Sequence, residues 1–258
     1  MIKGLYTAGS GMMLQMAKQD AIANNIANVN SAGYKKDVTV SKAFPDMLIS
    51  RLGENEKEGL GKYVSQPVEQ IGRLGTGVAI DEVYTDFSLG NLKKTDQNTD
   101  YALGAEGFFV VETPQGEAFT RDGKFKLDYE GLLMDNNGYP ILDIYDEYIY
   151  LDTDDITVDN LGNLSSAGEE LTRFKIVNFA DNNNLEKIGA NLLRAEGGYF
   201  EVENPEVVQG FIEESNVNAV KEMVDLISVT RTYESLQKVI QAEDEVTQIA
   251  IDKVASTM

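Results

Sequence analysis

The stretch ANNIANVNSAGYK, residues 23–35, decides how the N-terminal part of the chain folds. Four asparagines fall within it, although asparagine is a poor helix former because its side chain competes for backbone hydrogen bonds. Apolar residues nevertheless keep the 3-4 spacing of a buried helical stripe through the same stretch. We therefore predict a helix that buries one face and offers amides to neighbouring helices on the others. The amides expected there are Asn24, Asn25 and Asn28.

A helix is predicted from about Leu5 to Val29, upstream of and into this stretch. Its seam repeats every seven residues and is apolar except for Gln15 and Gln19, so the stripe is imperfect. Gly33 is expected to end the helix, since glycine accepts the left-handed backbone of a C-cap at little cost. The seam residues that we expect at an interface are Leu5, Met12, Ile22, Ile26 and Val29.

The strongest periodic signal lies at the C-terminal end of the chain, over residues 217–254. An unbroken 3-4 alternation starts at Leu226, and Ser215 or Asn216 is the expected N-cap. A helix of this length would reach about 57 Å at 1.5 Å per residue. Such a helix needs a partner for its stripe, either the N-terminal helix or other copies of itself. Its expected interface residues are Leu226, Tyr233, Leu236, Ile240 and Val254.

Between these ends the sequence changes to short alternating or apolar runs separated by turn residues. Strands of five to seven residues at this spacing predict an antiparallel β-domain, with a hairpin at Asp122-Gly123. We predict an α+β fold in which N- and C-terminal helices form a coiled-coil-like layer around this inserted β-domain. The expected parts are an N-terminal helix at 1–34, a flexible connection at 35–72, a β-rich domain at 73–210 and a long helix at 211–258 that pairs with the first.

Composition excludes several classes of function. The formal net charge of −21 argues against sequence-independent nucleic-acid binding and against docking on anionic lipid. Histidine and cysteine are both absent, so histidine-based triads, thiol nucleophiles and ordinary zinc sites are excluded. No apolar run approaches the roughly 20 residues that span a bilayer, so no direct membrane insertion is expected. The N-terminus is interpreted as retained mature sequence rather than a cleaved leader.

No catalytic, cofactor-binding or metal-binding pattern stands out among the acidic residues. The acidic run at 152–160 has Ile156 where an EF-hand loop needs an oxygen ligand and Thr157 where it needs glycine. This run is therefore predicted to be a solvated turn between strands. Paired carboxylates could serve a glycosidase, but no spacing singles out a pair among 43 acids. We expect no enzyme and no cofactor.

The helical stripes fit two arrangements. They could close an intramolecular helical hairpin on the chain's own β-domain. Alternatively, they could pack among helices of other copies, which suits polar seam residues such as Gln15 and Glu243 because amides and carboxylates can find partners across chains. We favour assembly.

Three stretches together resemble one family. SGM at 10–12 followed by ANNIANVNSAGYK is similar to the N-terminal signature of bacterial flagellar rod and hook proteins. LGAEGFFVVETPQGEAFTRDGKFKLDYEGLL at 103–133 resembles the family's central strand motif, and QGFIEESNVNAVKEMVDLISVTRTYES at 209–235 resembles its C-terminal helix motif. The chain looks like a hook-basal-body rod protein of the proximal or distal type, although Tyr34 stands where the family often has phenylalanine.

The resemblance implies a structural subunit of the bacterial flagellar rod that assembles helically into a tube, transmits torque and conducts exported subunits. Its implied partners are further copies, neighbouring rod and hook proteins and the flagellar export apparatus. Its implied place is the basal body in the cell envelope, reached without a cleaved signal peptide. The alternative from another class is a secreted oligomeric adhesion module whose acidic β-domain binds a ligand.

Overall fold

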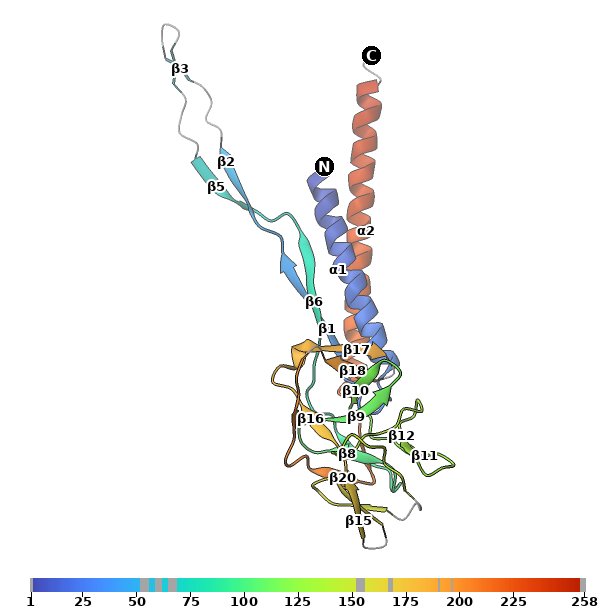
Figure 1. Ribbon diagram of the computed structural model, residues 1–258. Coiled ribbons are helices and arrows are strands. Elements are labelled where there is room, and N and C mark those ends of the chain that lie inside the picture. The colour runs from blue at the N-terminus through green and yellow to red at the C-terminus, as the bar shows by residue number, and fades with distance from the viewer. Residues whose placement is uncertain are drawn as a thin grey trace. The chain divides into compact units, whose positions relative to one another are not determined.

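The structure is a computed structural model that describes residues 2–51, 56–58, 62–64, 69–151, 156–166, 169–189, 191–195 and 197–255 (Figure 1). It contains helix α1 (Ile2–Ala27), helix α2 (Ala219–Ala255) and a β-rich middle, which confirms the predicted α+β class. The chain divides into two units. We call residues 1–23, 38–83 and 223–258 the helical unit, and residues 24–37 and 84–222 the β unit.

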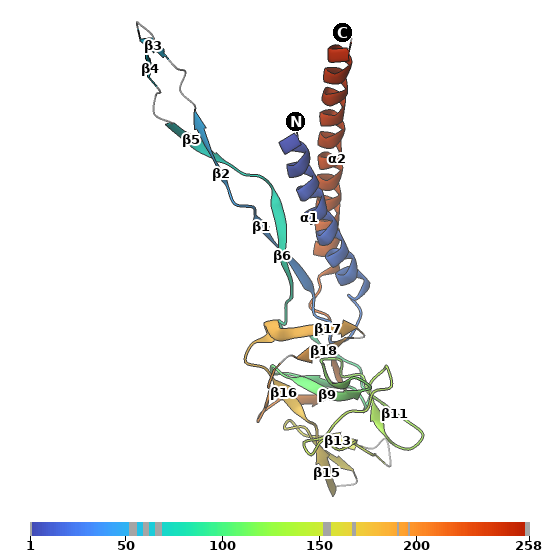
Figure 2. The same ribbon diagram turned by 45° about the horizontal axis from the view of Figure 1, so that its top comes forward.

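In the helical unit, α1 and α2 run side by side in opposite directions (Figures 1 and 2). Two glycines of α1 face α2: a Cβ atom on Gly4 would lie 2.6 Å from Glu243 Oε1, and one on Gly11 would lie 3.1 Å from Leu236 Cδ1. Ala8, between them on the same face, is buried. The side chains of Glu243 and Leu236 therefore pack on these glycines of α1, a contact that the heptad pattern did not predict.

The predicted stripe of α2 is its less exposed face over most of its length. From Leu226 to Glu243 the residues at the 3-4 positions are buried or half-buried, and most residues between them are exposed. Beyond Glu243 this distinction ends, because every residue from Asp244 to Lys253 is exposed. The covered part of α2 therefore ends near the residue that faces Gly4, close to the start of α1.

A two-stranded ribbon completes the helical unit. Strands β1 (Asp37–Ala43) and β6 (Val78–Thr85) pair, and β2 (Met47–Arg51) pairs with β5 (Glu69–Leu74). Helix α1 bonds to the ribbon through Thr7 Oγ1, which donates to the Thr76 carbonyl at 3.2 Å. The sequence pattern predicts no strand in residues 35–72. The structure gives the reason: Met47, Leu48 and Ile49 are all exposed, and the ribbon shows no alternation of buried and exposed side chains that a sequence pattern could reflect. Two short strands also pair, β3 (Glu56–Glu58) and β4 (Lys62–Val64).

The β unit is built on a six-stranded sheet. Its central strand β9 (Phe108–Thr113) is buried on both faces, which explains why its sequence is a continuous apolar run. Phe109 and Val111 join the larger core cluster, whereas Phe108 and Val110 join a second cluster on the opposite face. The strand order is β17 (Leu185–Gly189), β18 (Leu192–Ala195), β10 (Gly116–Thr120), β9, β16 (Ile176–Asn178) and β19 (Phe200–Glu201).

Smaller sheets surround this one. A three-stranded meander comprises β13, β14 and β15, and a 3-10 turn, η1 (Asn182–Asn184), precedes β17. The remaining strands form pairs: β11 with β12, β8 with β20, and β7 with β21. Their bounds are β7 Leu92–Lys94, β8 Tyr101–Leu103, β11 Lys126–Leu127, β12 Leu133–Met134, β13 Ile156–Val158, β14 Asn163–Ser166, β15 Glu169–Arg173, β20 Val207–Gln209 and β21 Phe211–Glu213.

The predicted hairpin at Asp122-Gly123 is wrong. Strand β10 pairs with β9 and β18, and the chain then leaves this sheet, because β11 pairs with β12 instead. A Cβ atom on Gly123 would lie 1.6 Å from the Tyr101 carbonyl oxygen, so this glycine permits close approach to β8. The turn residues that join β9 to β10 are Pro114 and Gln115.

The acidic run at 152–160 lies partly outside the described residues, including Asp152, Asp154 and Asp155. In the described part, the Asp159 carboxylate accepts backbone N–H groups of Leu161 and Asn163, both at 2.9 Å. That carboxylate therefore stabilises a turn. Among the described residues there is no group of three metal-ligating side chains, and no helix is both long and apolar enough to cross a membrane.

The core contains a buried hydroxyl group whose removal should stabilise the fold. Tyr101 is fully buried, and its hydroxyl has no hydrogen-bond partner in the described structure. We expect Tyr101→Phe to raise the free energy of unfolding by about 1 kcal/mol, since it removes an unsatisfied buried group. Urea unfolding measures the change.

The matched control is Tyr34→Phe. The Tyr34 hydroxyl donates to Asn25 Oδ1 at 3.2 Å, so its loss should lower stability by about 1 kcal/mol. Equal effects of the two substitutions would contradict the assignment of Tyr101 as unsatisfied.

Candidate functional site

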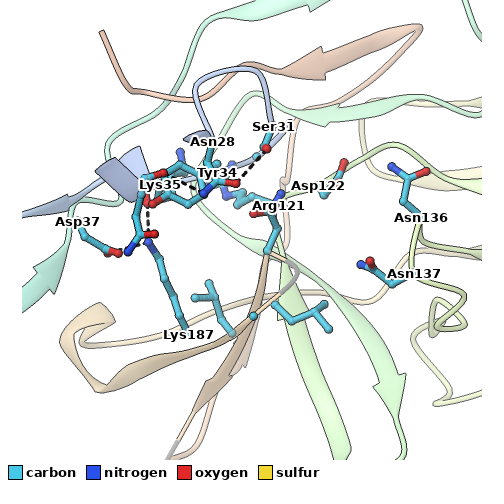
Figure 3. A pocket seen from close by; sticks show the side chains of 16 residues that line it. Asn28, Ser31, Tyr34, Lys35, Asp37, Arg121, Asp122, Asn136, Asn137 and Lys187 are labelled. Atoms are coloured by element: carbon cyan, nitrogen blue, oxygen red, sulfur yellow. Dashed lines mark hydrogen bonds and ion pairs between the residues drawn. The ribbon is translucent and has the colours of Figure 1, made fainter. Parts of the chain in front are cut away.

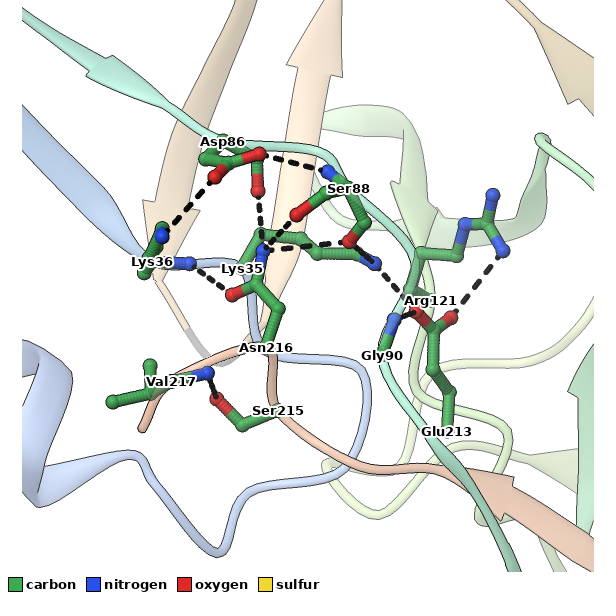
Figure 4. Close-up of polar contacts among 10 residues, drawn as sticks. All are labelled: Lys35, Lys36, Asp86, Ser88, Gly90, Arg121, Glu213, Ser215, Asn216 and Val217. Carbon is green, nitrogen blue, oxygen red and sulfur yellow. Dashed lines mark hydrogen bonds and ion pairs between the residues drawn. The ribbon is translucent and has the colours of Figure 1, made fainter. Parts of the chain in front are cut away.

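Three segments far apart in the sequence meet inside the β unit (Figure 4). They are residues 25–37, at and beyond the end of α1, Arg121 after β10, and residues 213–216, at and beyond the end of β21. These segments belong to the three stretches that carry the family resemblance. We call this meeting point the junction and define it by Asn25, Lys35, Arg121, Glu213 and Asn216. The junction is the best-built polar site in the described chain.

The Glu213 carboxylate lies at the centre of the junction, with only 1% of its side chain exposed. Its Oε1 accepts Lys35 Nζ at 2.5 Å and the Gly90 N–H at 2.7 Å, and its Oε2 accepts Arg121 Nη1 at 3.3 Å. The backbone carbonyl of Glu213 also accepts the N–H of Gly33 at 2.8 Å. One residue thus binds the N-terminal segment, the end of β10 and the loop before β7.

Burial governs the electrostatics of this cluster. It lowers the pKa of Lys35 and the pKa of Arg121, and the negative charge of Glu213 opposes both shifts. Two buried cations share one carboxylate, so removing that carboxylate would leave two buried charges without their direct counter-ion. Breaking a buried pair in this way costs about 3–5 kcal/mol.

Gly33 allows the N-terminal segment to reach the junction. Its φ of +66° lies in the left-handed region, and a Cβ atom there would lie 2.3 Å from the Arg121 carbonyl carbon. The expectation that Gly33 ends the helix is wrong, because α1 ends at Ala27. Instead, Asn28 Nδ2 donates to the Asn24 carbonyl at 2.9 Å and bonds the last turn of the helix from the side.

The side-chain amides of Asn25 and Asn216 bond to backbone N–H and C=O groups, as a peptide group would. Asn25 is 2% exposed; its Nδ2 donates to the Asp37 carbonyl and its Oδ1 accepts the Asp37 N–H, each at 2.9 Å. Asn216 Oδ1 accepts the Lys36 N–H at 2.9 Å, and its Nδ2 donates to the Asp86 carbonyl at 2.8 Å. An amide can replace a peptide group in this manner because it both donates and accepts.

A second basic residue holds the same segment to the sheet. Lys187 Nζ, on β17, donates to the Lys35 carbonyl and to Asp37 Oδ1, each at 2.6 Å, and lies 4.5 Å from the centre of the Tyr34 ring. Burial, together with the charge of Asp37, raises the pKa of Tyr34 to about 12. Tyr34 therefore stays protonated and acts as a hydrogen-bond donor at neutral pH.

The start of α2 differs from the prediction of Ser215 or Asn216 as the N-cap. The helix begins at Ala219, and Asn218 Oδ1 accepts the N–H of Lys221 at 3.1 Å, so Asn218 is the cap. Asn216 is bonded elsewhere in the junction, and Ser215 Oγ accepts the N–H of Val217.

The predicted interface residues fall into three groups by exposure. Leu5 and Asn24 are exposed, whereas Asn25 is buried and its amide is bonded within the chain. The side chain of Val254 is outside the described structure. The others are half-buried: Met12, Ile22, Ile26, Asn28, Val29, Leu226, Tyr233, Leu236 and Ile240.

Sequence reasoning missed Lys35, Arg121 and Glu213, although all three lie within the stretches it singled out. Lys35 and Glu213 are 178 positions apart, so no periodicity connects them. The sequence offers only a weak signal, which is that Glu213 directly follows two apolar residues, Phe211 and Ile212.

Comparison with known proteins agrees with this architecture. Three family models match: flagella basal body rod protein at residues 5–35, flagellar hook protein FlgE/F/G D1 domain at 102–176, and flagellar basal body rod FlgEFG protein C-terminal at 208–253. The chain is 31% identical to flagellar basal-body rod protein FlgG of Buchnera aphidicola subsp. Schizaphis graminum, over 96% of this chain and 98% of that protein. It is 33% identical to flagellar hook-basal body complex protein FlhO of Bacillus subtilis, over 99% and 98%.

A helix at each end of the chain and a β-rich middle are the architecture that the three family models cover. Flagellar basal-body rod protein FlgF of Caulobacter vibrioides is 31% identical over 98% of both chains. The chain belongs to the flagellar basal-body rod protein family.

The junction predicts a large effect from one substitution. Glu213→Ala should lower the free energy of unfolding by about 3–5 kcal/mol, because Lys35 and Arg121 would remain buried without their shared carboxylate. The neighbouring Glu214 is the matched control: its ion pair with Lys93 is solvent-exposed, so Glu214→Ala should change stability by less than about 1 kcal/mol. Chemical denaturation measures both, and similar losses would refute the central role of Glu213.

Asp122 predicts a pH dependence. Burial raises its pKa from 3.8 to about 6, so between these values the folded chain holds a proton that the unfolded chain has released. Its stabilising contribution is complete below about pH 3.8 and disappears as the pH rises through about 6. Above that pH the buried carboxylate costs up to about 3 kcal/mol, at 1.36 kcal/mol per pKa unit.

Asp122→Asn should therefore leave stability unchanged at pH 3.5 and raise it at pH 7. Urea unfolding of both proteins at intermediate pH values should show the difference growing between pH 4 and 6. A difference that is constant across this range would contradict the prediction.

Proposed function

We propose that this rod-family protein is a subunit that assembles helically with further copies into a tube, with its two terminal helices in the wall layer nearest the axis. The observation that carries the proposal is the end of α2. From Asp244 to Lys253 every residue is exposed, and Val246, Ile249 and Ile251 are among them. A short helical segment with no packed face is marginal in water, so it needs contacts that a single chain does not supply.

The outer face of α1 supports the same proposal. Tyr6, Met13 and Met16 are exposed at helical spacing on a helix whose other faces contact α2 and the ribbon. Near the start of α2, Val224 and Ile227 line a groove of about 440 Å³ and are also exposed. Exposed apolar surfaces of this extent typically mark protein–protein contacts.

A continuous helical layer of this kind would stiffen the tube, which is what transmission of torque requires. The tube would conduct exported subunits along its axis. The partners we propose are this protein itself, the neighbouring rod and hook proteins and the flagellar export apparatus. We place the subunit in the basal body within the cell envelope, exported with its N-terminal helix retained, because α1 is part of the packed helical unit.

The role that we propose is structural and not enzymatic. The junction uses its charged groups to hold backbone segments together: Glu213 is fully engaged by Lys35 and Arg121, and Lys187 by Asp37. Groups that are this well satisfied are poor acids, bases or nucleophiles.

Assembly is tested by a substitution on the uncovered end of α2. Ile249→Asp should leave thermal unfolding of the purified monomer unchanged, because the side chain is 55% exposed. It should abolish tube formation seen by electron microscopy, and motility of cells that carry it, because a carboxylate would be buried between subunits. Gln241→Asp, which adds the same charge at an exposed polar position, is the control.

Normal tubes from Ile249→Asp would rule out the contact proposed for this end of α2. Limited proteolysis gives a second measure. Residues 244–255 should be cleaved in the monomer and protected in tubes.

A further inference from the structure

The turn after β12 contains the only asparagine–glycine pair of the sequence, Asn137-Gly138. Both residues are exposed, so water reaches them. Asparagine is one of the chemically labile residues of proteins, and glycine is the neighbour that exposes its backbone nitrogen most to attack on the amide, because it has no side chain. Asn136 and Asn137 lie in the wall of a pocket of about 390 Å³ that Asp122 also lines (Figure 3). The junction bonds described above do not use this pair.

The conformation of the turn requires glycine at position 138. The Gly138 N–H donates to the Asp135 carbonyl at 3.2 Å, which closes a turn over residues 135–138, and the φ of Gly138 is +88°. This φ lies in the left-handed region, where a residue with a Cβ atom is strained. Aspartate at the first position and glycine at the last are typical of such a turn. The labile pair is therefore part of the local fold.

The reaction open to this pair is intramolecular. The backbone nitrogen of Gly138 attacks Cγ of Asn137, a new N–C bond closes a cyclic imide, and the C–N bond of the side-chain amide breaks. The proton lost by the Gly138 nitrogen ends on the departing nitrogen, which leaves as ammonia. Water then opens the imide at either carbonyl, and position 137 becomes aspartate or isoaspartate. Water is the only other reactant.

Asp135 binds both of the groups that must react. Its backbone carbonyl accepts the Gly138 N–H, and its carboxylate Oδ2 accepts Nδ2 of Asn137 at 2.9 Å. Oδ1 of the same carboxylate accepts the backbone N–H groups of Asn137 and Tyr139, each at 2.8 Å. Asp135 is itself buried, which fixes these acceptors in place. The attacking nitrogen and the departing amide are thus each held by a hydrogen bond that has to break before they react.

We propose that Asn137 is a site of spontaneous deamidation, and that the bond from its amide to Asp135 slows the reaction in the folded chain. The inference concerns the β unit of a single chain and does not rest on the proposed assembly.

The product would weaken the turn in which it forms. A carboxylate at position 137 would place an acceptor where the amide now donates to Asp135 Oδ2, so a bond between donor and acceptor becomes a repulsion between two carboxylates. Isoaspartate would also add a methylene group to the backbone. That addition displaces the N–H groups of Gly138 and Tyr139 from their acceptors on Asp135.

The test measures conversion at position 137 in the full chain. The purified protein is incubated at mildly alkaline pH, which speeds the reaction by deprotonating more of the attacking nitrogen. Peptide mass spectrometry then gives the fraction of acid at each asparagine. The chain unfolded in urea gives the rate without the Asp135 bonds. The native chain should convert at position 137 about tenfold more slowly, as expected for a hydrogen bond to a charged acceptor.

Asp135→Ala should raise the rate in the native chain about tenfold, toward that of the unfolded chain. Asp159→Ala is the matched control: the Asp159 carboxylate accepts the Asn163 amide at 2.8 Å, but leucine follows Asn163. It should leave positions 137 and 163 unchanged. Asp135→Asn repeats the test if the alanine variant does not fold, since it keeps an oxygen for the backbone N–H groups and loses the second acceptor.

The effect of the product is measured with Asn137→Asp, which should lower the midpoint of thermal unfolding. Gln115→Glu makes the same change from amide to acid at another exposed turn position and should leave the midpoint unchanged.

An absence of acid at position 137 in the native chain, when the unfolded chain is fully converted, would overturn the assignment of the site. Equal rates in the unmodified chain and in both Asp135 variants would refute the role of Asp135. An unchanged midpoint for Asn137→Asp would contradict the predicted weakening of the turn. Each of these results would leave the proposed assembly intact.

Discussion

The rest of the structure depends on one buried carboxylate that binds two cations. Glu213 ends the last strand of the β unit, and its partners Lys35 and Arg121 come from the N-terminal segment and the centre of the chain. Desolvation makes each of these charges costly alone, so the three segments are stable only together. This requirement fixes the loop after α1 and the segment before α2 on the same β unit.

The asparagines of residues 23–35 contribute to this same β unit. The Asn25 amide bonds to the backbone of Asp37, and the Asn28 amide donates to a carbonyl in the last turn of α1. Both amides therefore bond to the backbone of their own chain. Between α1 and α2, the side chains of Glu243 and Leu236 lie over the glycines at positions 4 and 11. The polarity of the helix end therefore has a local cause.

The helical unit has the opposite character from the junction, since much of its apolar surface is uncovered. The last ten described helical positions before Val254 are exposed, and so are Tyr6 and Met13 on α1. Burial of such side chains supplies about 1.5–3 kcal/mol each, which a monomer does not gain. A well-satisfied β unit joined to incompletely covered helices is the distribution expected of a subunit that completes its packing on assembly.

The sequence by itself determined the α+β class, the presence of a helix at each end, the covered stripe of α2 from Leu226 and the family. These follow from periodicity and local motifs, which depend on residues close together in the chain. Only the tertiary structure decided that β9 turns into β10 at Pro114-Gln115, that Asn218 caps α2, and that Lys35 and Arg121 meet Glu213. Those features depend on contacts between residues up to 178 positions apart, and a local pattern carries no information about which distant charge will be brought to it.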